Sequence, residues 1–177
     1  MRNSECEINN AVFRTSLGWV GVAATEQGIS RIILPKKDKA AVLRELGDEE
    51  IDGMSGPAAS PLLAKAVKLL KRYFSGESVS FDVPLDLRYY TPFQQAVWKA
   101  AAAIAPGETR SYAWIAKRIR NPKAARAVGQ ALGANPVPII IPCHRVISSA
   151  GTMGGYSGGL GMKKKLLELE AIAKVLH

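Results

Sequence analysis

Strand-forming sequence is concentrated at the start of the chain, and this uneven distribution limits the possible folds more than any other feature of the sequence. Residues 8–34 contain three runs rich in β-branched and aromatic residues, separated by SLG and TEQG at the spacing of hairpin turns. These runs predict an antiparallel meander. The rest of the chain carries mainly helix start and stop signals. We therefore expect an α/β (α+β) protein with an N-terminal three-stranded antiparallel sheet plus helices, followed by a mostly helical C-terminal part.

Two helices are predicted in the remainder of the N-terminal part. A short helix is expected around KAAVLREL (39–46), and a longer one in SPLLAKAVKLLKRYFSGE (60–77). Ser60 suits the N-cap, Pro61 suits the first helical position and Gly76 ends the helix. Its predicted apolar face consists of Leu62, Ala66, Leu69 and Tyr73. The following segment, up to residue 90, reads as an extended linker with some strand, so we expect two domains, residues 1–88 and 89–177.

The second region opens with a helix that has clear signals at both ends. Thr91 and Gln94 in TPFQQAVWKAAAAI have capping-box spacing, and Pro106 with Gly107 stops the helix. Two short helices are expected next, at 111–119 and 121–133, joined by a tight turn with Asn121 as the second N-cap. This outline is that of a helix-turn-helix, although an ordinary helical hairpin has the same spacing.

Positive charge accumulates in this second region. The net charge is +9, and no Asp or Glu occurs between Thr109 and Lys165. The basic residues of this stretch are Arg110, Lys117, Arg118, Arg120, Lys123, Arg126, Arg145, Lys163, Lys164 and Lys165. A surface built from them would attract a nucleic acid, whereas the alternative is a merely solvated basic face.

The outer face of the helix predicted at 121–133 favours DNA. At 100° per residue, Val128 and Leu132 fall on the packed side, while Arg126 falls on the opposite side beside Lys123 and Gln130. The flanks hold only small residues, namely Ala127, Gly129 and Ala131. A helix with small side chains around one protruding arginine can approach a DNA groove closely, and the arginine can then fill the space left by an extruded base.

The chain is expected to be an intracellular, cytoplasmic protein. It is 47% hydrophobic, contains no apolar run of membrane-spanning length, and begins without a signal-peptide pattern. Cys6 and Cys143 are therefore expected to be free thiols. We expect neither a cofactor nor a metal ion, because two cysteines and two histidines at these spacings do not make a zinc site.

The chemistry is expected at Cys143. A thiol is only a few per cent thiolate at neutral pH, so a reactive cysteine needs a nearby base or cation, and His144 and Arg145 are the neighbouring candidates. His144 is expected to act through a turn or a bridging water. On the last helix, Glu170 falls on the apolar face, where it can orient His144 or pair with a cation elsewhere. The alternative is a buried, inert cysteine beside a hydrogen-bonded core histidine.

The sequence NPKAARAVGQALGANPVPIIIPCHRVI, followed by GGYSGGL, resembles the O6-alkylguanine-DNA alkyltransferases, also called methylated-DNA–protein-cysteine methyltransferases. The similarity runs from about Thr91 to Glu170 and is most specific at PCHRV. It implies an RNase H-like N-terminal support domain and a C-terminal winged-helix or helix-turn-helix domain that enters the DNA minor groove. Some relatives carry zinc in the N-terminal domain, but residues 1–142 here contain one Cys and no His.

The resemblance also implies the reaction. Cys143 would take the alkyl group from O6 of a flipped guanine in double-stranded DNA, and each protein molecule would act once. O4-alkylthymine is a second candidate lesion. His144 would act through a water, and Glu170 would complete the relay. Tyr112 would assist guanine release and contact the adjacent DNA backbone, and Asn135 would link the recognition helix to the active-site strand. A cytoplasmic prokaryotic monomer is expected, or a nuclear protein in a eukaryote.

Further residues receive roles from the same resemblance. Arg126 would replace the flipped base, with Ala127 and Gly129 allowing close approach, and Asn121 and Ser149 would touch phosphate. The guanine pocket would be lined by Val146, Tyr156, Ser157 and Gly158. Two rival functions remain at this point: a cysteine hydrolase, and a non-catalytic protein that senses lesions.

Overall fold

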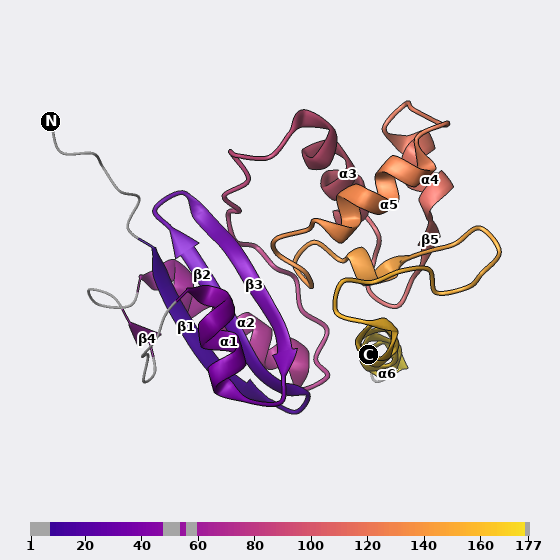
Figure 1. Cartoon of the computed structure of the whole chain (residues 1–177). Coiled ribbons are helices and arrows are strands. Elements are labelled where there is room, and N and C mark those ends of the chain that lie inside the picture. Colours follow the sequence, from indigo (N-terminus) through magenta and orange to yellow (C-terminus); the bar gives the residue numbers. More distant parts are fainter. Residues whose placement is uncertain (1–7, 48–53, 56–59, 176–177) are drawn as a thin grey trace, which may run out of the picture. The chain divides into compact units, whose positions relative to one another are not determined.

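The computed structural model describes residues 8–47, 54–55 and 60–175, and it divides into two compact units, Met1–Leu87 and Arg88–His177 (Figure 1). The first unit contains the predicted meander. Strands β1 (Asn9–Thr15), β2 (Gly18–Thr25) and β3 (Gly28–Lys36) pair antiparallel in chain order. A two-residue strand that was not predicted, β4 (Met54–Ser55), adds to the free edge of β1 and gives the order β3-β2-β1-β4.

Helices cover both faces of this sheet. Helix α1 (Lys39–Leu46) lies where predicted, and its Val42 packs with Val12 and Ile33. Gly21 lies on the same face, and a Cβ at this position would come within 2.6 Å of the Val42 side chain, so glycine permits the close approach. Helix α2 (Pro61–Phe74) covers the other face, where the Lys71 ammonium lies 5.6 Å from the centre of the Phe13 ring.

Helix α2 confirms the predicted start but corrects the predicted face. The Ser60 hydroxyl accepts a hydrogen bond from the Leu63 backbone, as expected of an N-cap. The buried side chains are Leu63, Ala66, Leu70, Tyr73 and Phe74, whereas Leu62 and Leu69 are only half-buried. The sequence has two adjacent leucines at each of two positions, 62–63 and 69–70, so local spacing allowed either one to face the sheet. Packing against the sheet buries the second leucine of each pair. The segment after α2 runs extended beside β3, where Leu85 makes an isolated bridge to Ile29.

The second unit is built around three helices that pack on one another. These are α3 (Pro92–Ala102), α4 (Tyr112–Arg118) and α5 (Ala125–Gly133). The predicted Thr91–Gln94 capping box at the start of α3 is present. The buried Trp98 indole donates a hydrogen bond of 2.8 Å to the Ala131 carbonyl oxygen and so ties α3 to α5.

The start of α5 differs from the prediction. The helix begins at Ala125, so Asn121 is not its N-cap, and no side chain caps it. The preceding residues form a turn in which Arg120 has a φ of 58° and the Asn121 backbone N–H bonds back to the Ala116 carbonyl. This turn occupies the residues that the Asn-Pro signal assigned to the helix: the left-handed Arg120 ends α4, and a further turn closed by the Ala124 N–H on the Asn121 carbonyl oxygen precedes α5.

A short parallel strand pair and a long helix complete the unit. β5 (Arg110–Ser111) pairs with β6 (Val146–Ile147), which follows a 3-10 turn at Cys143–Arg145, and α6 (Leu160–Val175) ends the described chain. No helix in the described ranges is long and apolar enough to cross a membrane.

Candidate active site

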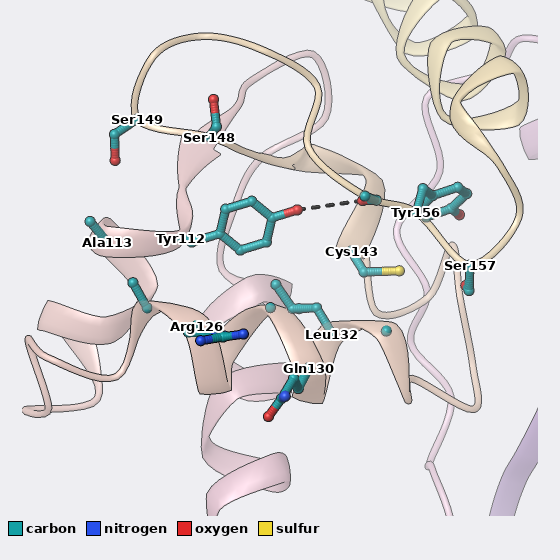
Figure 2. Close-up of a pocket in the computed structure, with 14 residues that line it drawn as sticks. Tyr112, Ala113, Arg126, Gln130, Leu132, Cys143, Ser148, Ser149, Tyr156 and Ser157 are labelled. Carbon is teal, nitrogen blue, oxygen red and sulfur yellow. Dashed lines mark hydrogen bonds between the residues drawn. The ribbon is translucent and has the colours of Figure 1, made fainter.

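A cavity of about 660 Å³ opens in the C-terminal unit, and Cys143 is among the residues that line it. Helices α4 and α5 form one side, and the loop between β6 and α6 forms the other (Figure 2). The cavity brings together seven of the predicted site residues: Tyr112, Arg126, Gly129, Cys143, Ser149, Tyr156 and Ser157. Its size is that of a small-ligand site.

The cysteine is held by the turn that contains it and by one asparagine. Asn135 Nδ2 donates to Cys143 Sγ at 3.1 Å and to the Ile141 carbonyl oxygen at 2.9 Å, while its Oδ1 accepts from the Val137 backbone at 3.0 Å. The Cys143 side chain is 5% exposed. Asn135, which follows α5, therefore links that helix directly to the thiol and to the backbone that carries it.

Behind the cysteine lies a buried ionic network centred on Glu170. Its Oε1 lies 2.7 Å from His144 Nε2 and accepts a hydrogen bond of 2.9 Å from Arg145 Nη2, and its Oε2 accepts one of 2.9 Å from Arg145 Nε. Oε2 also accepts a bond of 3.2 Å from the Gly107 backbone. The carboxylate therefore has both partners that the sequence allowed: the imidazole and a cation.

The pKa values of this network follow from burial and pairing. Burial alone would raise the pKa of Glu170, but the hydrogen bonds from His144 and Arg145 outweigh it and lower the pKa to about 2. Burial lowers the pKa of His144, although Glu170 acts in the opposite direction. At neutral pH the network therefore holds an ionised Glu170 and a neutral His144 ring.

The structure corrects the predicted basic surface at two positions. Arg145 is 7% exposed and paired with Glu170, and Lys163 is completely buried. Neither can belong to an exposed basic face. The helical spacing of Lys163 with Leu166, Glu170 and Ala173, all buried, was the signal that could have placed it inside.

Lys163, rather than Arg145, is the cation whose charge acts on the thiol. Burial raises the pKa of Cys143, whereas the hydrogen bond from Asn135 and the positive charge of Lys163 lower it. The net direction is upward, so the free thiol is mainly protonated at neutral pH. A proton must therefore be removed before the sulfur can act as a nucleophile.

Two tyrosines border the cavity near the sulfur (Figure 2). The Tyr112 hydroxyl donates a 3.4 Å hydrogen bond to the Gly155 carbonyl oxygen. The Tyr156 hydroxyl has no hydrogen bond of good geometry within the described residues, and its burial raises the pKa, which the nearby Cys143 sulfur raises further. Burial also raises the pKa of Tyr112. Both phenols are therefore protonated at neutral pH.

Glycine is required where the loop crosses Tyr112. Gly154 has a φ of +64°, and a Cβ there would lie 2.6 Å from the Tyr112 hydroxyl oxygen. The loop can therefore rest on Tyr112 only because this residue lacks a side chain.

The remaining predicted residues lie around the cavity or beside it. Arg126 is exposed on the outer face of α5 and lines the cavity together with Gln130, which the sequence had placed on the same face (Figure 2). Ser149 and Asn121 are also exposed, and Ala127 is half-buried. Val146 is completely buried and Gly158 is exposed, and neither is a lining residue.

Comparison with known proteins matches both halves of the chain to one family. Residues 8–87 match the "6-O-methylguanine DNA methyltransferase, ribonuclease-like domain", and residues 92–172 match the "6-O-methylguanine DNA methyltransferase, DNA binding domain". A methylated-DNA--protein-cysteine methyltransferase of Methanosarcina acetivorans is 41% identical over 160 residues, which cover 90% of this chain and 96% of the relative. The protein of the same name from Mycobacterium bovis is 59% identical over 105 residues, and this match spans 59% of the chain and only 63% of that relative.

Solved structures lead to the same family. A crystal structure of Mycobacterium tuberculosis OGT in complex with DNA has a TM-score of 0.74 and 41% identity, and the match covers 92% of each chain. An O6-methylguanine-DNA methyltransferase from Pyrococcus kodakaraensis has a TM-score of 0.67 and 26% identity, covering 93% of this chain and 99% of the other. The predicted resemblance and the predicted fold class are thereby confirmed, and the chain belongs to the 6-O-methylguanine DNA methyltransferase family.

Proposed function

We propose that the protein repairs double-stranded DNA by transferring the alkyl group of O6-alkylguanine to Cys143. The observation that carries this proposal is the placement of a buried thiol on a cavity bordered by a helix with one exposed arginine. Family membership supports it, because relatives are named methylated-DNA--protein-cysteine methyltransferases and one related structure is titled as a complex with DNA. O4-alkylthymine would present the same reacting group to the sulfur and is the second candidate substrate.

The reaction begins with removal of the thiol proton. His144 is neutral and its Nε2 is held by Glu170, so the other ring nitrogen is the one available to take this proton through a bridging water. The ionised Glu170 stabilises the imidazolium that forms. Asn135 donates to the sulfur and holds it in place throughout.

The thiolate then displaces the base from the alkyl carbon. A carbon–sulfur bond forms as the carbon–O6 bond breaks, the bonding electrons go to the guanine, and the base takes up one proton. Tyr112 is protonated at neutral pH and borders the cavity, so it can donate this proton. The proton that His144 took from the thiol then returns to Tyr112 through solvent, which leaves both residues neutral. The thioether product is not cleaved by water, and each molecule is therefore used once.

DNA recognition is assigned to the exposed side of α5 and to the neighbouring turns. In this proposal α5 enters the minor groove, Arg126 fills the space of the extruded nucleotide, and Asn121 and Ser149 contact phosphates. Flipping costs a few kcal/mol, least for a damaged pair, so the lesion is partly selected before the chemical step. Of the residues that the resemblance assigned to the guanine pocket, Tyr156 and Ser157 line the cavity and would hold the base, whereas Val146 and Gly158 would support the pocket from outside its lining.

Stoichiometry tests the proposed function. With lesion-containing duplex in excess, the amount of guanine restored should stop at one per protein molecule, as measured by nucleoside chromatography after digestion. Continued turnover would reject the single use of each protein molecule. The rival cysteine hydrolase would instead turn over a thiol-reactive peptide substrate. Binding without any restored guanine would favour a lesion sensor.

Arg126→Ala is expected to slow repair of a duplex far more than reaction with the free alkylated base. The arginine is needed only where a nucleotide must be extruded from a stack, and that cost of a few kcal/mol corresponds to a rate loss of about tenfold to a hundredfold. Single-turnover rates on both substrates give the comparison. Lys123→Ala is the control, because it removes an equal exposed charge outside the cavity lining. Equal rate losses on duplex and free base would show that Arg126 does not fill the space of the extruded nucleotide.

A further inference from the structure

Lys163 is a completely buried lysine on α6 that no step described so far uses. Its ammonium nitrogen donates hydrogen bonds to three backbone carbonyl oxygens: Val146 at 2.6 Å, Gly155 at 3.4 Å, and Met153. Val146 is the third residue after Cys143, and Gly155 lines the cavity. The lysine therefore joins the segment that carries the thiol to the loop that covers it.

The hydrogen bonds indicate the charge state of this lysine. An ammonium group has three N–H donors and no acceptor, and three carbonyl oxygens match it. A neutral amine would offer two donors and turn its lone pair toward the third carbonyl. Lys163 is therefore a buried cation in this structure.

A buried cation needs a negative partner, and the carboxylates nearby are already engaged. Glu170 pairs with His144 and Arg145, and Glu168 lies on the exposed side of α6 near Lys164. Among the described residues, no salt bridge includes Lys163. The other titratable groups around the sulfur, Tyr112, Tyr156 and His144, are neutral at pH 7 for the reasons given above.

We propose that Lys163 is a positioning residue that supplies the counter-charge for the Cys143 thiolate and fixes residues 153–155 over the cavity. As a role in the transfer reaction, this rests on the proposed function. Burial lowers the pKa of Lys163 and raises that of Cys143, and the attraction between the two charges opposes both changes: Cys143 raises the pKa of Lys163, and Lys163 lowers the pKa of Cys143. Alkylation replaces the thiolate by a neutral thioether, so Lys163 then faces no anion at the sulfur.

The reactivity of the thiol toward iodoacetamide tests the counter-charge without using DNA. Lys163→Met keeps the length of the stem but removes the charge, so the thiol pKa should rise by about one unit and the rate at neutral pH should fall about tenfold. The rate should be followed across a pH series on the Cys143 peptide by mass spectrometry. It should recover at high pH, where the thiol ionises unaided, whereas a merely structural defect lowers the rate at every pH.

Two further variants sharpen the test. Lys165→Met removes one charge from the exposed side of the same helix and should leave the pH dependence of the iodoacetamide reaction unchanged. Lys163→Arg keeps a positive charge at the buried position and should show most of the wild-type pH dependence. Identical profiles for Lys163→Met and Lys165→Met would overturn the proposal.

The wild-type protein provides a measurement that does not depend on the stability of any variant. Carbon-13 NMR of the lysine Cε atoms follows the titration of Lys163 before and after Cys143 is alkylated by iodoacetamide. The pKa of Lys163 should fall on alkylation, because the anionic partner is lost, and an unchanged titration would overturn the proposal. Failure of the protein to accept a methyl group from DNA would instead reject the proposed function and leave these thiol measurements intact.

Discussion

Cys143→Ser is expected to abolish methyl transfer while leaving binding to lesion-containing duplex DNA close to that of the wild type. A serine hydroxyl is far less acidic than a thiol, so no nucleophile forms at neutral pH even with His144 and Lys163 in place. The substitution keeps the side-chain shape in a site that is 5% exposed. The residues assigned to DNA contact lie on α5 and in neighbouring turns, and their geometry does not depend on the sulfur.

The two properties of this variant are measured separately. Transfer is followed by restored guanine, and affinity is followed by fluorescence anisotropy of labelled duplexes with and without the lesion. A Cys6→Ser variant controls for the other cysteine, whose predicted free thiol lies outside the described residues, and should transfer normally. A large loss of duplex affinity in Cys143→Ser would contradict the separation of binding from chemistry.

Glu170→Gln is expected to lower both the free energy of unfolding and the transfer rate. The carboxylate is the anion of a buried network with His144 and Arg145, and its neutral replacement leaves the buried Arg145 guanidinium without a counter-charge. Breaking a buried ion pair in this way costs about 3–5 kcal/mol. The transfer rate should fall as well, because His144 loses the group that orients its ring and stabilises the imidazolium.

Urea denaturation and single-turnover kinetics measure these two losses. Glu168→Gln is a matched control on the same helix, because Glu168 is exposed and its separation of 3.8 Å from Lys164 describes a weak surface pair. Its free energy of unfolding should change by less than about 0.5 kcal/mol. A Glu170→Gln protein as stable and as active as the Glu168→Gln control would refute the role assigned to the network.

The acid response of the wild type follows from the same carboxylate. The pKa of Glu170 is lowered from 4.5 to about 2 in the folded protein, so its contribution to stability is complete above about pH 4.5. That contribution, about 3 kcal/mol, is lost as the pH falls toward 2. The unfolding free energy of Glu170→Gln should therefore depend less on pH over this interval than that of the wild type.

Local sequence signals predicted most of the secondary structure because they act over a few residues. The hairpin turns located β1 to β3, and the Ser60 and Thr91 caps located the starts of α2 and α3. The errors arose where tertiary packing decided between local alternatives. Contact with the sheet buries Leu63 and Leu70 in place of their neighbours, and α5 starts late because residues 121–124 form a turn before it.

The candidate site was predicted unevenly for a similar reason. Helical spacing alone predicted that Glu170 lies on the buried side of α6, and there it contacts His144. Charge counting, in contrast, treated Arg145 and Lys163 as surface residues, because composition does not distinguish an exposed cation from one with buried partners. The hydrogen bond from Asn135 to the sulfur was not predictable from spacing, since it depends on the turn that brings residue 135 back to residue 143.

The most direct measurement of the central claim is intact-protein mass spectrometry after incubation with a short duplex that carries one O6-methylguanine, followed by peptide mapping. We predict a mass gain equal to one methyl group replacing one hydrogen, located on Cys143 and saturating at one per protein molecule. An unchanged mass in a protein that still binds the duplex would contradict the proposal and favour the lesion-sensing function.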